Sequence, residues 1–411
     1  MLACTALWWS VVGSTPASGQ AMEGAPERLA IFLDCGWCNQ TFIRQEMTYV
    51  DYVRDREGAD VHVLVTDVNT AAGGEAFTFD LIGRGVFQGM DHTAQFTSEA
   101  GATQDQERRG FLRTLQVALA PYLIHTSVGP RLALQVGDGN GSVDTQPADD
   151  PWNNWTFEVY GDAWANFESS QQSLRARYGL SAERVTEEWK IRLRPFFNYN
   201  FDEFERNDET ITSTSRRDGF DAYVVKSLGP HWSAGLFGDV YTSTFSNIDL
   251  RYRGMPAVEY SVFPYREATR RQLTFTYRVG GIHVTYADTT IFNEISEVLP
   301  EHAFNAAYEV TQPWGEIDIG VEVSQYLHDT SKYSAEFGGD VEVRITRGLS
   351  VEFGGDVEWI KNQLNLPKGD ASLDEVLLRR RQLATNYELS FQFGFNYRFG
   401  SIYNNVVNTR F

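Results

Sequence analysis

The sequence predicts a multidomain protein, with a small periplasmic α/β (α+β) domain followed by a twelve-stranded antiparallel transmembrane β-barrel. Near the end of the chain, residues 390–399 alternate polar with aromatic side chains: Phe391, Phe393, Phe395, Tyr397 and Phe399 occupy successive odd positions. A half-buried strand of a soluble protein rarely carries a large aromatic at every apolar position, whereas a strand between lipid and a wet interior does. Eleven further alternating segments follow residue 154, and their connections alternate between short and long, as in transmembrane barrels.

The composition fits this fold class and excludes others. The 411 residues leave room for two domains, and 14% aromatic residues with 35 glycines favour β-structure. A mean hydropathy of −0.35 is compatible with a barrel, because half of each strand is polar. No run of 18 apolar residues follows the N-terminal segment, which argues against a helical membrane protein. The net charge of −20, without a basic stripe, argues against nucleic-acid binding.

Residues 1–21 resemble a secretory signal peptide, with an apolar core followed by small residues. No Lys or Arg precedes the apolar core, so we expect the true start to lie upstream. Leu2, Ala3 and Cys4 also resemble a lipobox, but the apolar segment that lipidation needs would have to precede them.

Residues 28–127 lack barrel-type alternation and predict a domain with the element order β-α-β-β-β-α. The expected elements are a strand at 29–33, a helix whose apolar face includes Ile43, Met47, Tyr49, Val50 and Val53, strands at 61–65, 76–81 and 85–96, and a second helix. Thr103 and Gln106 form a capping-box pattern at the start of that helix. Residues 128–153 are predicted to be a linker, because 137–152 are rich in Gly, Asp and Pro.

The barrel is predicted over 154–400, with a C-terminal tail at 401–411. The expected strands are 155–169, 172–185, 188–205, 209–226, 231–247, 250–265, 270–288, 298–312, 315–327, 332–346, 349–364 and 384–400. Short connections at 228–231, 313–315 and 347–349 alternate with longer ones, such as 289–302 and 365–381. This rhythm predicts that both termini lie in the periplasm and that the long loops lie outside the cell. Residues 374–383 are expected to form a short helix.

The positions that alternate with the lipid-facing residues define a charged lumen. One wall is acidic, with Arg344 as its main cation, and comprises Glu316, Asp318, Glu322, Glu336, Asp340, Glu342, Glu352, Asp356 and Glu358. Another wall is basic and comprises Arg175, Arg177, Lys190, Arg192, Arg194 and Arg398. The charges either pair across a narrow, filled interior or create a transverse field across a channel that orients a polar or zwitterionic solute. The lumen is open only if residues 402–411 do not occlude it.

Cys35 and Cys38 form a Cys-x-x-Cys motif between a strand and a helix, where a thioredoxin-like redox pair would lie. No proline occurs between Pro26 and Pro121 to supply the cis-proline of that fold. A structural disulfide or an inert pair is therefore the favoured interpretation. Dithiol chemistry, or metal binding together with His62, is the alternative, although two cysteines and one histidine fall one ligand short of a closed zinc site.

A catalytic barrel is a weaker alternative. His231, His283, His302 and His328 show no local serine-histidine signature, so no catalytic residue is assigned and no cofactor is expected.

The alternating strands, the loop asymmetry and the end of the chain, Phe399 to Phe411, resemble Gram-negative outer-membrane β-barrel proteins with an N-terminal periplasmic domain. The resemblance implies an outer-membrane location, contact with outer-membrane lipid and recognition by the barrel assembly machinery during insertion. A narrow passive channel for small polar solutes is the leading functional hypothesis. The alternative is a non-conducting barrel that anchors a periplasmic binding or envelope-assembly domain with a protein partner.

Overall fold

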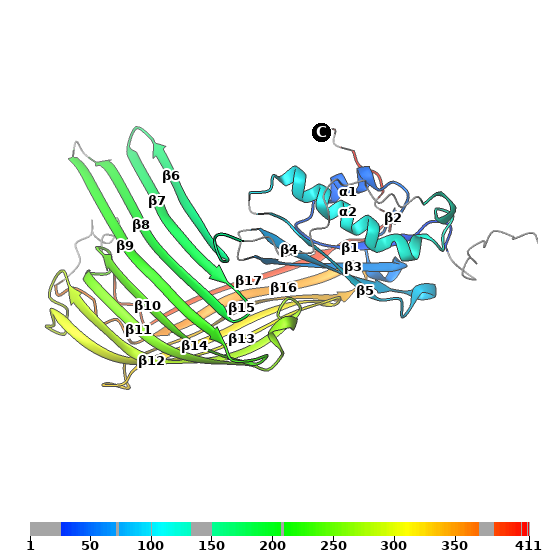
Figure 1. The fold of residues 1–411 in the computed structure, drawn as a ribbon. Coiled ribbons are helices and arrows are strands. Elements are labelled where there is room, and N and C mark those ends of the chain that lie inside the picture. Colours follow the sequence, from blue (N-terminus) through cyan, green and yellow to red (C-terminus); the bar gives the residue numbers. More distant parts are fainter. Residues whose placement is uncertain are drawn as a thin grey trace, which may run out of the picture.

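The computed structural model describes residues 26–70, 74–99, 101–132, 150–206, 209–369, 382–403, 405–408 and 410. These residues form two sheets, a five-stranded one in the N-terminal domain and a twelve-stranded one that follows it (Figure 1). The predicted signal peptide, at 1–21, lies outside the described residues, as do most of the linker and most of the helix expected at 374–383.

The N-terminal domain has the predicted β-α-β-β-β-α order, with one additional short strand. Its sheet has the order β2-β1-β3-β4-β5, in which β1 pairs in parallel with β2 and β3, and β4 pairs antiparallel with β3 and β5. The elements are β1 (Ala30–Asp34), α1 (Gln40–Glu46), β2 (Asp51–Tyr52), η1 (Arg56–Gly58), β3 (Val61–Asn69), β4 (Glu75–Gly83), η2 (Gly85–Phe87), β5 (His92–Thr97), α2 (Gln104–Leu123) and η3 (Gly129–Arg131). Neither described α-helix combines the length and the apolar character that a membrane-spanning helix needs.

Both helices of this domain cover one face of its sheet, and the other face is turned toward the large sheet (Figure 1). Ile31 and Val63 lie in one apolar core with Ile43 of α1 and Leu115 of α2. The alternate residues of β1 and β3, among them His62, lie on the opposite face, because successive side chains of a strand point to opposite sides.

The first helix is shorter than predicted. α1 ends at Glu46, and the hydroxyl of Tyr52 donates hydrogen bonds to the carbonyl oxygens of Ile43 and Met47, 3.2 Å away in each case. Val50 is buried next to the short strand β2 and not on a helix. An apolar spacing that suits a helix also suits a helix followed by a turn and a strand, so the spacing did not fix this boundary.

The start of β5, the capping of α2 and the extent of the domain can also be compared with the predictions. The strand expected from residue 85 begins at His92, because residues 85–87 form the 3₁₀ turn η2, with Gly85 at a positive φ of 55°. The capping box of Thr103 and Gln106 at the start of α2 is confirmed. Packing of the domain continues beyond residue 127, since Leu132 contacts its core.

The large sheet is an antiparallel meander of twelve strands in sequence order, as predicted. The strands are β6 (Trp155–Phe167), β7 (Gln171–Val185), β8 (Trp189–Arg206), β9 (Glu209–Ser227), β10 (Trp232–Ser243), β11 (Ile248–Ser261), β12 (Arg271–Tyr286), β13 (Ser296–Gln312), β14 (Gly315–Tyr326), β15 (Tyr333–Thr346), β16 (Leu349–Ile360) and β17 (Tyr387–Tyr397), with the 3₁₀ turn η4 (Tyr265–Glu267) before β12. Within the described residues, the edge strands β6 and β17 do not pair with each other.

The two faces of this sheet differ in chemistry. The apolar face carries the aromatic residues of β17, and Phe391 and Phe395 are 83% and 72% exposed. On the same face, Phe353 of β16 lies directly opposite Phe393, with ring centroids 5.0 Å apart. Exposed aromatic side chains on neighbouring strands give this face a contiguous apolar surface. The polar face, on the other side of the same strands, carries the acidic residues of the predicted lumen.

Candidate functional site: a charged face and a docked domain

The acidic residues predicted for the lumen lie on one face of β14, β15 and β16 and form rows across these strands. Glu316, Glu342 and Glu352 are direct cross-strand partners in one row. Asp318 and Asp340 form a second pair, which Glu309 of β13 extends. The last row comprises Glu322, Glu336, Glu358 and Glu388 on four successive strands, and Asp356 lies between these rows.

These rows place like charges directly opposite each other, where the Cβ atoms of cross-strand partners are only about 5 Å apart. Such pairs destabilise a sheet unless water or counter-ions screen them. Among the described residues, Glu322 is the only one of the nine predicted carboxylates in an ion pair, 2.7 Å from Arg278. Glu358 instead accepts a hydrogen bond of 2.8 Å from the hydroxyl of Ser334. The acidic wall is therefore not neutralised by cations of the described chain.

The predicted basic wall pairs with its own neighbours. Arg177 forms an ion pair with Asp162, Arg192 with Glu183 and Arg194 with Asp221, at 3.2, 3.0 and 3.1 Å. Arg175 lies over the ring of Trp164 and Lys190 over that of Tyr223. The two walls are therefore unequal, because the basic residues on β7 and β8 are largely compensated and the acidic residues on β14 to β16 are not.

Arg344, predicted as the main cation of the acidic wall, binds the N-terminal domain. Its guanidinium donates hydrogen bonds to both carboxylate oxygens of Asp34 in the N-terminal domain and lies 5.6 Å from the ring centroid of Phe32. Asp34 also accepts a bond of 2.9 Å from Nε2 of His62, which is 1% exposed. Burial raises the pKa of Asp34, but the hydrogen bonds from His62 and Arg344 outweigh it, so the pKa lies below its ordinary value.

Further contacts hold the N-terminal domain against the short-turn end of the large sheet. Asp55 pairs with Arg347 at 2.9 Å and Asp80 with Arg270 at 3.4 Å. In all three interdomain ion pairs of the described residues the acid comes from the domain and the arginine from the sheet, so the two surfaces are electrostatically complementary.

The C-terminal tail lies on this domain. The amide of Arg54 donates to the carbonyl oxygen of Ile402 at 2.8 Å, and the amide of Tyr52 donates to Oδ1 of Asn405 at 2.6 Å. Val53 forms an antiparallel bridge with Tyr403. These described tail residues thus extend the edge of the small sheet next to β2.

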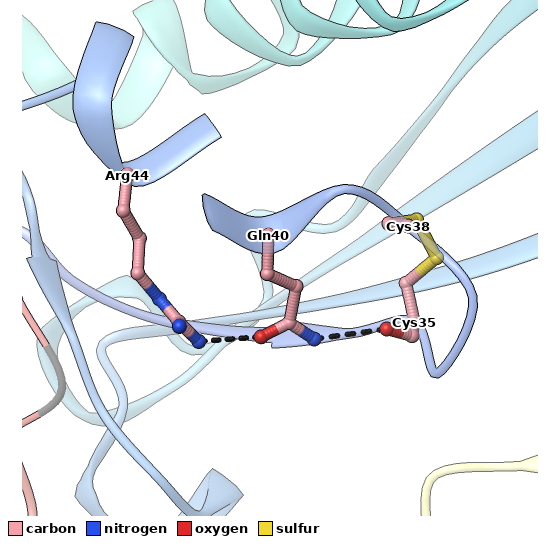
Figure 2. Close-up of a disulfide and its surroundings, with 4 residues drawn as sticks. All are labelled: Cys35, Cys38, Gln40 and Arg44. Carbon is pink, nitrogen blue, oxygen red and sulfur yellow. Dashed lines mark hydrogen bonds between the residues drawn. A yellow bond between two sulfur atoms is a disulfide. The ribbon is translucent and has the colours of Figure 1, made fainter. Parts of the chain in front are cut away.

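Cys35 and Cys38 are joined by a disulfide in the turn between β1 and α1. Figure 2 shows the side chain of Gln40 donating a 2.9 Å hydrogen bond to the carbonyl oxygen of Cys35, while Arg44 donates to the same amide group. The described peptide bonds include no cis bond, and the described residues contain no group of three or more potential metal ligands. His62 is bonded to Asp34 instead.

A cavity of about 680 Å³ lies between the domain and the sheet. The disulfide loop lines it on one side, through Asp34, Cys35 and Trp37. The row of Glu316, Glu342 and Glu352 lines it on the other, together with Arg398, another of the predicted lumen residues. This first acidic row therefore faces a space that the N-terminal domain covers.

At the opposite end of the sheet, the segment that follows β16 reaches across the polar face. Leu364 packs against Ile282 and Leu299 of β12 and β13. Asn365 exchanges hydrogen bonds with the β10–β11 connection, since its side chain donates to Ser246 and its carbonyl accepts from Asn247, at 2.9 and 3.0 Å. Strand β16 was expected to continue to residue 364, but Leu364 leaves the ladder and is buried on the far wall instead.

The segment 361–366 covers a second cavity, of about 870 Å³, whose lining includes charged residues that were not among the predicted lumen residues. These are Arg251, Arg253, Arg278, Glu301 and Glu388. The alternation in Arg251-Tyr252-Arg253 gives a signal for two of them, because it puts both arginines on the face opposite Tyr252. Glu301 has a similar signal, since it alternates with the outward-facing His302.

The histidines of the large sheet form no serine-histidine pair between side chains within the described residues. His302 contacts the hydroxyl of Tyr277 and the amide of Gln325, at 3.1 and 3.2 Å. Nδ1 of His231 lies 2.8 Å from the backbone carbonyl oxygen of Ser261, and its ring stacks on that of Tyr260.

No family model matches the chain, and no curated protein matches it. Matches among solved structures include one titled "NanC porin structure in rhombohedral crystal form", with 9% sequence identity and a TM-score of 0.26. The matched region covers 59% of this chain and 100% of that chain. The function is therefore inferred from the residues of this chain.

Proposed function

We propose that the chain is an integral outer-membrane β-barrel that forms a narrow passive channel for small polar solutes, with its N-terminal domain in the periplasm. In this proposal β6 and β17 close the sheet in the membrane, the apolar face contacts lipid and the polar face lines a water-filled lumen. The proposal includes no catalytic step and no cofactor.

The observation that carries the proposal is the set of carboxylates directly opposite one another on β14, β15 and β16. A dry interior filled by salt bridges would place a cation beside each carboxylate, because an unpaired buried charge is strongly destabilising. Only Glu322 among the nine predicted acidic residues has such a partner in the described chain. Water and mobile cations can screen the others, and a channel supplies both.

Neutralising part of one row should change ion selectivity. We expect the full chain to conduct in planar bilayers and to prefer cations, and the Asp318→Asn, Asp340→Asn double variant to lose much of that preference, measured as a smaller reversal potential in a salt gradient. Glu187→Gln, an exposed carboxylate in the β7–β8 turn, is the matched control and should behave as the parent chain. No conductance from correctly inserted protein, or an unchanged reversal potential in the double variant, would refute the channel.

A second candidate is a non-conducting barrel that anchors the N-terminal domain for a binding or assembly role. The firmly docked domain favours it, since three ion pairs and the tail hold the domain over one end of the sheet. Absence of conductance, together with a specific periplasmic protein cross-linked to the exposed Trp37 region, would support this candidate over the channel. Trp37 is 49% exposed and could contact such a partner.

A further inference from the structure

The cavity of about 870 Å³ under segment 361–366 combines three kinds of lining. Arg251, Arg253 and Arg278 supply positive charge from β11 and β12. Negative charge comes from Glu301 of β13 and from Glu322, Glu358 and Glu388 of the last acidic row. Apolar surface comes from Ile282, Val284, Leu299 and Leu364, together with the tyrosines at 286 and 326.

Two of the three arginines in the cavity are already paired. Arg253 forms an ion pair of 2.8 Å with Asp239, and Arg278 forms one of 2.7 Å with Glu322. Arg251 differs, because its guanidinium donates a 2.8 Å hydrogen bond to the hydroxyl of Tyr241 and forms no ion pair with any described residue. One cation of the site is thus left with a neutral partner.

Glu301 is the matching uncompensated anion. It is 6% exposed, and its Oε2 has no hydrogen-bond partner in the described chain. Arg253, Arg251 and Arg278 line the same cavity, but none of them forms an ion pair with Glu301. A buried carboxylate without a bonded partner is costly, and both it and Arg251 line the same cavity.

The pair of unmatched charges restricts what can fill the site. A simple anion would satisfy Arg251 and leave Glu301 unpaired, and a simple cation would do the reverse. A molecule that carries an ammonium and a carboxylate satisfies both. The apolar wall around Leu364 would in addition favour an apolar side chain on that molecule, because burial of apolar surface stabilises binding.

We propose that this cavity is a binding site for a small zwitterion with an apolar side chain, either a free amino acid or a short peptide, with the ammonium on Glu301 and the carboxylate on Arg251. This proposal adds a substrate class to the proposed channel. Binding itself does not require a channel, and only the role of the site in transport rests on the proposed function. The site lies beneath segment 361–366, at the end of β16 where the long external loop 365–381 was expected to begin, so it would select solutes at that end of the channel.

The test uses the full chain in detergent and ligand-observed saturation-transfer NMR with four probes. These are leucine, dileucine, 4-methylpentanoate, which is leucine without the ammonium, and isoamylamine, which is leucine without the carboxylate. We expect leucine or dileucine to bind at least about tenfold more tightly than either singly charged analogue, since each lost charge-assisted hydrogen bond costs about a factor of ten or more. Whichever of leucine and dileucine binds more tightly shows whether the ligand is a free amino acid or a short peptide. Because this series uses only the parent chain, it does not depend on a variant that folds.

Two variants then test which residue binds the ammonium and which binds the carboxylate. Glu301→Gln should weaken leucine binding and abolish its advantage over 4-methylpentanoate, and Arg251→Gln should abolish its advantage over isoamylamine. Arg177→Gln, in an exposed pair on β7, should leave all four probes unchanged. Equal binding of leucine and the singly charged analogues, or no binding of either zwitterion at concentrations up to about 10 mM, would overturn the site. Binding without conductance would retain the site and refute the channel.

Discussion

Removing Arg344 should loosen the N-terminal domain from the large sheet. In Arg344→Gln the buried carboxylate of Asp34 keeps its bond to His62 and loses both hydrogen bonds from the guanidinium. Breaking a buried ion pair costs about 3–5 kcal/mol. Because the side chain of Arg344 is 29% exposed and Asp34 keeps one partner, we expect a smaller loss, of about 2–3 kcal/mol.

Hydrogen exchange provides the assay. The amides of Tyr52 and Arg54 are bonded to the tail at Asn405 and Ile402, so they exchange when the domain undocks. A loss of about 2–3 kcal/mol corresponds to exchange roughly 30- to 150-fold faster. Arg177→Gln, whose partner Asp162 is also largely exposed and lies on β6, should leave these amides unchanged.

A double-mutant cycle shows whether the effect belongs to the pair. Asp34→Asn and Arg344→Gln should be less than additive, with a coupling of about 1–3 kcal/mol. Strictly additive effects, or unchanged exchange in Arg344→Gln, would refute the assignment of Asp34 and Arg344 as the contact that holds the domain.

The same pair makes docking sensitive to acid. Because the pKa of Asp34 is lowered in the docked state, that state binds fewer protons than the undocked state. The contribution of Asp34 to docking is therefore complete above the ordinary carboxyl pKa of about 4 and is lost as the pH falls through the lowered value. Arg344→Gln should flatten this acid-side dependence of exchange, and an equally steep profile in the variant would contradict it.

Three further outcomes are expected. Phe395→Arg should cost about 2–4 kcal/mol of barrel stability if that side chain contacts lipid near the bilayer midplane, whereas Asn396→Arg on the polar face should be mild; denaturant titration in lipid vesicles compares them, and equal losses would contradict the assignment of the faces. Replacing Cys35 and Cys38 by Ser should leave insertion intact and lower the stability of the N-terminal domain by no more than about 2 kcal/mol, because the ring that they close is small; a lost thiol-oxidation activity would instead indicate a redox role. Thr103→Ala should destabilise α2 by about 1 kcal/mol in thermal unfolding, since it removes half of the capping box, and Thr103→Ser should restore most of that loss.

The strands were predictable because a period of two is a strong local signal when the apolar positions are large. All twelve expected segments are strands of one antiparallel sheet, and most ends agree within three residues. The predicted strand ends are wrong where tertiary contacts compete with the alternation. Residues 361–364 were expected to extend β16, yet the strand ends at Ile360 and Leu364 is buried against Ile282 and Leu299 on the polar face.

The charged site was only partly predictable. Alternation predicts that Glu316, Glu342 and Glu352 share a face, but not that they lie directly opposite one another, because the register depends on the hairpin turns. Arg344 carried no local sign of its partner, since Asp34 lies 310 positions away. Glu301 and Arg251 could be assigned to a face from sequence, but their lack of partners appears only when all neighbouring strands are in place.

The contact between the C-terminal tail and the N-terminal domain also has a consequence for assembly. Tyr52 and Asn405 are separated by 353 positions, so their bond encloses nearly the whole chain in one loop. The entropic cost of closing a loop grows only logarithmically with its length, so the great length of this loop adds little to the free energy of forming the contact. We expect the contact to form late in folding, because it is long-range and residue 405 follows β17, which pairs with β16. An N-terminal domain that holds the tail would then indicate a chain whose last strand has been added.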